Sequence, residues 1–156
     1  MTPGGNRAWR VALGADHAGY AAKKELFREL AGLGYKVVDY GTHSVEPCDY
    51  PEYALRVSKA VAGGRCDRGI LVCGSGLGME IAANKVRGIR AAAPWSVRTA
   101  KLASQHNWSN VLCLPGRFAS IPTLKKMAAA WLKTAPERGG RHERRVKKII
   151  KIESKF

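Results

Sequence analysis

The glycine-rich segment Cys73-Gly74-Ser75-Gly76-Leu77-Gly78 has the clearest capacity for chemistry in this sequence. It joins an apolar run to a segment of helical periodicity. Its glycines let the backbone turn tightly, and free N–H groups at the start of the next helix can bind negative charge. The Lys-Ser/Thr pair of a Walker A loop is absent, and Met79 occupies the position of the third glycine in a dinucleotide fingerprint. The segment predicts a turn that binds an anion, unless it is a glycine-rich turn without a ligand.

Cys73 differs from the other cysteines because it directly precedes this turn. A helix N-terminus stabilises a thiolate, which is the form that acts as a base or nucleophile. A buried cysteine without chemistry at a strand end is the alternative. Cys48, Cys66 and Cys113 are widely spaced and form no C-x-x-C pair. We therefore expect neither a thiolate zinc site nor a disulfide framework.

Further polar residues follow other apolar or helical segments. Asp16-His17 comes after the first apolar run, and Gln105-His106-Asn107 is expected in a loop after a helix. Arg141 and Arg145 are four residues apart on an expected helix, so both guanidiniums can project from one face and hold one phosphate. Each pattern also has an ordinary interpretation: a helix cap, a solvated loop histidine or a solvated basic face.

Short β-branched runs alternate with longer segments of helical period. Strands are expected over residues 9–13, 36–40, 69–73, 89–93 and 110–114, and helices over 21–33, 52–62, 77–84, 96–104, 121–133 and 141–153. This alternation predicts an α/β fold of the doubly wound, Rossmann-like type, with a five-stranded parallel sheet and helices on both faces. Ligands bind at the carboxyl ends of strands in such sheets, where Asp16, His17, Cys73 and Arg117 are expected.

Length and composition restrict the class of protein. A chain of 156 residues fits one domain, predicted over residues 9–156 after a short flexible arm at 1–8. The content of 46% hydrophobic and 25% charged residues is typical of a globular protein and excludes a disordered one. No apolar run approaches the roughly 18 residues of a membrane span, and the N-terminus lacks the apolar region of a signal peptide. We therefore expect a cytoplasmic protein without a membrane partner.

The charge is unusual. Twenty-seven Lys and Arg residues against twelve Asp and Glu residues give a net charge of +15. Such an excess favours an anionic partner, which could be nucleic acid, a membrane surface or a phosphorylated metabolite. Nine basic and three acidic residues fall within the last 24. Basic and aromatic residues are not interleaved along the chain as in many nucleic-acid binders, so nucleic acid is not the expected partner.

Together these motifs resemble the ribose-5-phosphate isomerase B family, which also includes galactose- and allose-6-phosphate isomerases. They occur in the order of that family and span residues 9–152. The matching segments are Gly14–Gly19, Asp49-Tyr50-Pro51, Cys73–Gly76 with Ile81–Lys85, Gln105–Asn107, Pro115–Arg117, and Gly140–His142 with Arg145-Val146.

The resemblance implies an aldose–ketose isomerase that needs neither a metal nor a cofactor and acts on a phosphorylated sugar. Cys73 would be the base that moves a proton between C1 and C2 through a cis-enediolate. His106, assisted by Asp16, would open the furanose ring. Some members instead carry a glutamate at the position of Met79, so this chain resembles the cysteine type.

The remaining site residues implied by the resemblance bind the substrate. The amides of the glycine-rich turn would hold the developing oxyanion, and Asn107 would hold the C1 oxygen. His17 and three arginines would hold the phosphate. The implied substrate-binding residues are His17, Tyr50, Gly74, Ser75, Gly76, Gly78 and Asn107, and the implied phosphate-binding arginines are Arg117, Arg141 and Arg145.

The family resemblance also implies a homodimer or a dimer of dimers, with sites that combine residues of two subunits. The C-terminal helix would contact the partner through Val146, Ile149 and Ile150. Isomerisation of a five-carbon phosphate is the first interpretation, and a six-carbon phosphate on the same site is the second. A basic α/β module that binds nucleic acid through its last helix, and one half of a hetero-oligomer, remain as alternatives. The presence of Cys73 and His106 argues against the alternative of a catalytically inactive subunit in a hetero-oligomer.

Overall fold

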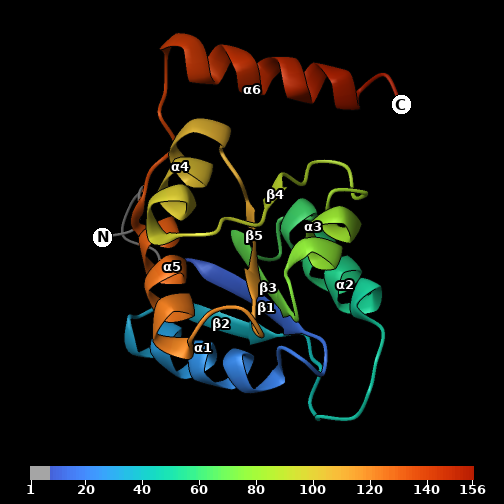
Figure 1. The fold of residues 1–156 in the computed structure, drawn as a ribbon. Coiled ribbons are helices and arrows are strands. Elements are labelled where there is room, and N and C mark those ends of the chain that lie inside the picture. The colour runs from blue at the N-terminus through green and yellow to red at the C-terminus, as the bar shows by residue number, and fades with distance from the viewer. Residues whose placement is uncertain (1–7) are drawn as a thin grey trace.

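The computed structural model describes residues 8–156, so the arm expected over residues 1–8 lies almost entirely outside the described residues. Strands and helices alternate along the chain (Figure 1). The strands are β1 (Arg10–Ala15), β2 (Lys36–Asp39), β3 (Arg68–Cys73), β4 (Ala91–Ala92) and β5 (Val111–Pro115). The helices are α1 (Tyr20–Gly32), α2 (Tyr50–Ala62), α3 (Leu77–Ala83), α4 (Val97–Asn107), α5 (Ile121–Lys133) and α6 (Gly140–Glu153).

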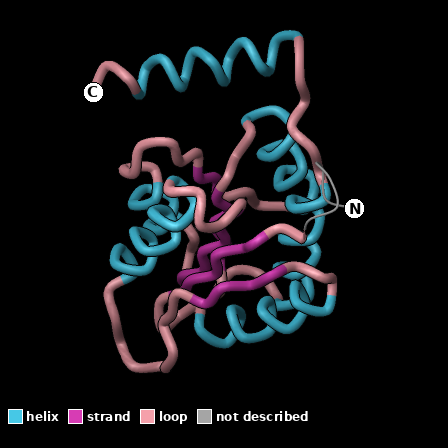
Figure 2. Tube along the Cα trace, turned by 180° about the vertical axis from the view of Figure 1, so that it is seen from behind, coloured by secondary structure: helices cyan, strands magenta, loops and turns pink. Residues whose placement is uncertain are grey.

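The five strands form one parallel sheet in the order β2-β1-β3-β5-β4. All six residues of the central strand β3 are buried, as its continuous apolar run predicts for a strand covered on both faces. Helices α1, α4 and α5 pack on one face of the sheet, while α2 and α3 cover the other (Figure 2). The predicted α/β fold with a five-stranded parallel sheet is confirmed.

Strand β4 is shorter than its expected range of residues 89–93. The N–H groups on both sides of it are bonded to side chains instead of to a neighbouring strand. Arg90 N–H donates to Asn110 Oδ1 at 2.8 Å, and Ala93 N–H donates to Glu80 Oε1 at 2.9 Å. These side-chain acceptors end the ladder after two residues.

Helix α6 stands apart from the layered body and lies across the end of α4 (Figure 1). Val146 is buried, and Glu153 Oε1 accepts the Gly88 N–H at 2.7 Å near the other end of the helix. Ile149, Ile150 and the neighbouring Ile152 remain 45%, 43% and 57% exposed. The apolar stripe expected on this helix is therefore covered only at Val146 within one chain. Among the described residues, no helix is both long enough and apolar enough to cross a bilayer.

Candidate functional site

The carboxyl ends of β1, β3 and β5 are tied to one another by main-chain hydrogen bonds. The Gly116 N–H donates to the Cys73 carbonyl at 2.8 Å, and the Arg117 N–H donates to the Gly74 carbonyl at 3.0 Å. The Asp16 N–H donates to the Val72 carbonyl at 3.2 Å. The loops that follow β1, β3 and β5, which carry predicted site residues, are therefore held next to one another at this edge of the sheet.

Cys73 is buried at the start of the glycine-rich turn, with only 4% of its surface exposed. Its Sγ accepts the Gly76 N–H at 3.2 Å, a contact that becomes stronger when the sulfur carries a negative charge. Gly76 has a φ of +81° and directly precedes α3, so this position favours glycine. The turn thus directs a backbone donor at the Cys73 sulfur.

Tyr50 and Arg117 flank the turn at its two other glycines. A Cβ at Gly78 would lie 2.6 Å from Tyr50 Cζ, so the tyrosine ring rests on the backbone of that glycine. A Cβ at Gly74 would lie 3.4 Å from Arg117 Cδ, so the exposed arginine side chain passes close to the turn. An aromatic ring and a guanidinium therefore lie beside the glycine-rich turn that begins at Cys73.

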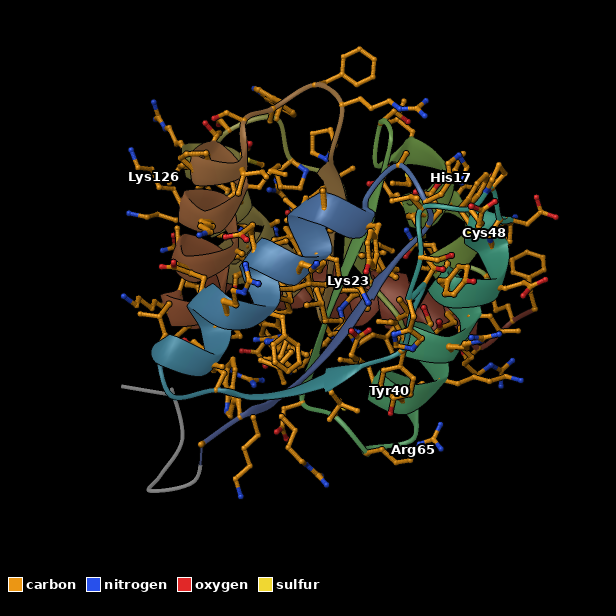
Figure 3. All side chains as sticks on the ribbon, turned by 90° about the horizontal axis from the view of Figure 1, so that it is seen from below. His17, Lys23, Tyr40, Cys48, Arg65 and Lys126 are labelled. Atoms are coloured by element: carbon orange, nitrogen blue, oxygen red, sulfur yellow. The ribbon has the colours of Figure 1, made fainter. Side chains whose placement is uncertain are left out.

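His17 lies beside the loop that follows β2 (Figure 3). Its Nδ1 accepts the Cys48 N–H at 3.2 Å, and Cys48 Sγ lies 4.0 Å from the same nitrogen. A neutral imidazole that accepts at Nδ1 carries its proton on Nε2, and it presents that nitrogen as a donor. Asp16 is also buried, and its Oδ1 accepts the Gly19 N–H at 3.1 Å. The sequence could not reveal the contact between Cys48 and His17, because the main-chain N–H of Cys48 makes it and not its side chain.

His106 and Asn107 occupy the last turn of α4, and their expected placement in a loop after residue 104 is wrong. The helix begins at a reciprocal cap between Ser96 and Thr99 and continues until Trp108 adopts a left-handed conformation with a φ of +52°. The polar residues of its last turn have a composition that is typical of a loop. This turn is nevertheless helical, because α4 packs on α5 through residues earlier in the helix.

Two residues to which the sequence assigned no role lie beside His106. The His142 ring stacks on the His106 ring with centroids 3.8 Å apart and planes within 6°. Glu137 Oε2 lies 4.0 Å from His106 Nε2. Desolvation and the nearby His106 lower the pKa of His142, while Glu137 acts in the opposite direction. One ligand atom from each of these three residues lies within 4.8 Å of the other two, so they could hold a metal ion.

The predicted site residues fall into two groups at opposite ends of the sheet. Arg68 begins β3 and Cys73 ends it, about 17 Å away at the rise of an extended strand. The Arg68 Nη1 donates at 2.8 Å to the carbonyl of Ser109, two residues after Asn107. His106 and Asn107 therefore lie near the amino end of β3. One chain does not bring His106 to Cys73.

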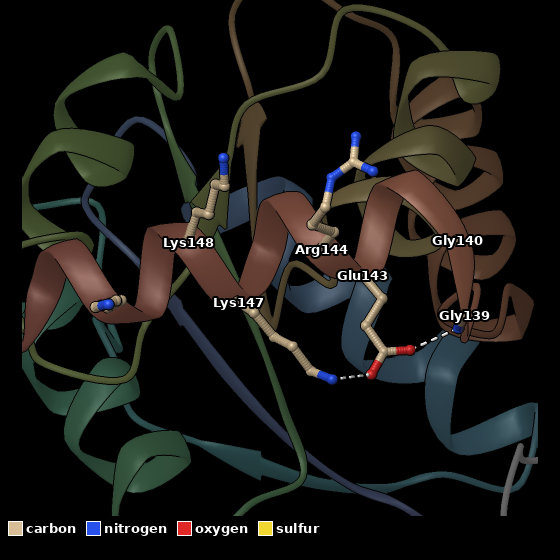
Figure 4. Close-up of a pocket in the computed structure, with 7 residues that line it drawn as sticks. Gly139, Gly140, Glu143, Arg144, Lys147 and Lys148 are labelled. Atoms are coloured by element: carbon tan, nitrogen blue, oxygen red, sulfur yellow. Dashed lines mark hydrogen bonds and ion pairs between the residues drawn. The ribbon is translucent and has the colours of Figure 1, made fainter.

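Arg141 and Arg145 belong to the second group because they lie on α6, which packs against α4. A separate hollow follows the same helix and is lined by basic side chains, including Arg144 and Lys148 (Figure 4). Glu143 in this hollow accepts the Gly139 N–H and pairs with Lys147 at 2.8 Å. The one carboxylate among the described lining residues is thus already held by two donors.

A family model described as Ribose/Galactose Isomerase matches residues 11–149. This chain belongs to that isomerase family. The family resemblance stated from the motifs is therefore confirmed. Ribose-5-phosphate isomerase B of Escherichia coli K12 is 45% identical over 146 residues, which cover 94% of this chain and 97% of that protein.

Solved structures of family members have the same fold. Ribose-5-phosphate isomerase B of Clostridium thermocellum matches with a TM-score of 0.90 and 46% identity, covering 94% of this chain and 98% of that one. The enzyme of Mycoplasma genitalium, solved with bound ribulose 5-phosphate, matches with a TM-score of 0.90 and 39% identity. That match covers 97% of this chain and 100% of the other.

Proposed function

We propose that this protein is a ribose-5-phosphate isomerase that interconverts ribose 5-phosphate and ribulose 5-phosphate, within a single domain over residues 9–156. The observation that carries the proposal is the buried Cys73 thiol on a glycine turn, flanked by Tyr50 and Arg117. The family supports it, because the relative in Escherichia coli is named ribose-5-phosphate isomerase B and the structure from Mycoplasma genitalium contains ribulose 5-phosphate.

In the proposed reaction, the Cys73 thiolate removes the proton from C2 of the open-chain aldose. The C2–H electron pair forms the C1=C2 bond, and the negative charge moves to the C1 oxygen. The thiol then returns the proton to C1, while the proton of the C2 hydroxyl passes to the C1 oxygen, which yields the ketose. Amides of residues 74–78 would donate to the developing oxyanion, where fixed donors lower the barrier most.

The other roles remain those implied by the family resemblance. His106, with Asp16 assisting, would transfer the proton of the C1 hydroxyl to the ring oxygen and so open the furanose. Asn107 would hold the C1 oxygen, and Ser75 would contact the substrate. His17 offers its Nε2–H, and Arg117 its guanidinium, to the phosphate. A cytoplasmic location remains a prediction.

We further propose that each site is completed by a second copy of this chain. His106 and Asn107 lie at the end of the sheet remote from Cys73, so a partner would have to supply the second group. The exposed Ile149 and Ile150 on α6 offer an apolar surface for that partner. A two-fold dimer has two equivalent sites, each taking Cys73 from one copy and His106 from the other.

The test combines two inactive variants. Cys73→Ala and His106→Asn are each expected to lose about 100- to 10,000-fold of the turnover of ribose 5-phosphate, measured with EDTA present. When equal amounts are unfolded and refolded together, half of the dimers are mixed, and one of their two sites has both residues. About a quarter of wild-type activity is then expected to return.

Failure of the mixture to recover activity, with the mixed dimer demonstrated by two different affinity tags, would place the whole site within one chain. Full activity of Cys73→Ala would refute the assignment of the base. Allose 6-phosphate, galactose 6-phosphate and unphosphorylated ribose are assayed in parallel with the wild type. Turnover of a six-carbon sugar phosphate alone would leave the proposed role of Cys73 in place, but it would show that ribose 5-phosphate is not the substrate.

A further inference from the structure

Three potential metal ligands from distant parts of the sequence converge where α4 meets α6. His106 lies in the last turn of α4, Glu137 follows α5, and His142 lies in the first turn of α6. All three side chains are partly exposed, so an ion from solvent can reach them. Two imidazoles and one carboxylate are a ligand set typical of zinc sites that keep one position open for water.

The backbone that carries Glu137 is fixed relative to the turn that carries His106. The Glu137 N–H donates to the Gln105 carbonyl at 2.8 Å, and the Trp108 indole N–H donates to the Glu137 carbonyl at 3.0 Å. Both contacts use the main chain of Glu137, so its carboxylate is not required for them. The ligands are therefore held close together without any metal.

The three ligand atoms are close enough to reach one ion once their side chains rotate. Ligand atoms about 2.0–2.1 Å from a tetrahedral zinc ion lie roughly 3.3 Å from each other. The three atoms now lie within 4.8 Å of one another, and His106 Nε2 is 4.0 Å from Glu137 Oε2. Rotation of the Glu137 side chain shortens its distance to His106, and one imidazole must also turn out of the His106–His142 stack, because the in-plane lone pairs of parallel rings do not converge on one ion.

We propose that His106, Glu137 and His142 form a binding site for a divalent transition-metal ion, with Zn²⁺ as the best fit. Neighbouring charges set the affinity. Arg141 and Arg145 place positive charge near His142 and so repel a cation. Arg141 Nε donates to His142 Nε2 at 3.3 Å, so an ion on this nitrogen must displace the guanidinium. The site is therefore a weak, reversible one.

A bound ion would occupy the lone pair on His106 that ring opening needs. If the proposed isomerase function holds, the ion would inhibit turnover of the cyclic substrate. This consequence rests on the proposed function, whereas the binding itself does not. Binding is therefore measured directly and separately from activity.

The experiment titrates the full-length, metal-free protein with Zn²⁺ by calorimetry and with Co²⁺ by visible absorption. One ion per chain is expected, with Co²⁺ bands of a nitrogen–oxygen site and without a thiolate charge-transfer band. Glu137→Gln and His142→Asn are each expected to weaken binding by more than about tenfold. His43→Asn removes an exposed histidine on the loop after β2 and is expected to bind like wild type.

Equal binding by wild type, Glu137→Gln and His142→Asn would overturn the proposal. A thiolate band would also overturn it, because the ion would then lie on a cysteine such as Cys48 or Cys73. In the activity assay, Zn²⁺ should inhibit the wild type, and Glu137→Gln should require more than about tenfold higher Zn²⁺ for the same inhibition. Absence of turnover in the metal-free wild type would refute the proposed function alone, since the binding measurements still decide the metal site.

Discussion

The ion pair between the buried Lys23 and the partly exposed Asp39 gives a prediction about stability that does not depend on the function. Lys23 lies in α1 with its side chain 2% exposed, and its Nζ is 2.5 and 2.6 Å from the two carboxylate oxygens of Asp39 (Figure 3). Asp39 ends β2, its side chain is 29% exposed, and it also accepts the Gly41 N–H at 2.8 Å. We expect Asp39→Asn to destabilise the protein more than Lys23→Met.

The difference follows from the group that each substitution leaves behind. Asp39→Asn leaves a buried ammonium without an anion, and loss of one partner from a buried pair costs about 3–5 kcal/mol. The Asn amide oxygen still accepts one hydrogen bond, so a value of about 3 kcal/mol is expected. Lys23→Met leaves a carboxylate that water reaches and that keeps the Gly41 N–H, so we expect about 1 kcal/mol.

Urea denaturation followed by circular dichroism measures both losses. For a chain of this length, about 3 kcal/mol corresponds to a fall in Tm of roughly 6–12 °C. The double variant Lys23→Met/Asp39→Asn is expected to be more stable than Asp39→Asn alone, because no unpaired charge remains buried. Additive losses, or a larger loss for Lys23→Met, would refute the view that the pair is one desolvated unit.

Two further predictions concern the site and the surface. Gly78→Ala places a Cβ 2.6 Å from Tyr50 Cζ, so the ring must move; we expect a loss of about 1–3 kcal/mol in urea denaturation and a raised KM. Wild-type stability or an unchanged KM would contradict this contact. A hydrogen bond from Lys125 lowers the pKa of Glu25, so its stabilisation is present above the ordinary value of 4.5 and is lost as pH falls through the folded-state value. Glu25→Gln should therefore lower Tm at pH 7 and leave it unchanged near pH 2, and an equal loss at both pH values would refute the linkage.

The elements that could be predicted from the sequence are those with a local cap and a clear spacing of buried residues. The helix at Ile121–Lys133 has its expected bounds, because Ser120 caps it and its buried residues recur at helical spacing. Strand β4 and the end of α4 could not be placed from local pattern. Their limits depend on contacts with Glu80, Asn110 and other residues far along the chain or on a left-handed Trp108.

The division of the site into two groups was accessible from the same topological rule that located Cys73. Residues after a strand of a parallel sheet lie at its carboxyl edge, and residues just before the next strand lie at the opposite edge. Cys73 follows β3, whereas His106 precedes β5, so the rule places them a strand length apart. The family resemblance assigns both to one reaction. Topology and chemistry agree only if a second copy supplies one of the two residues, and the mixed-dimer experiment tests that consequence.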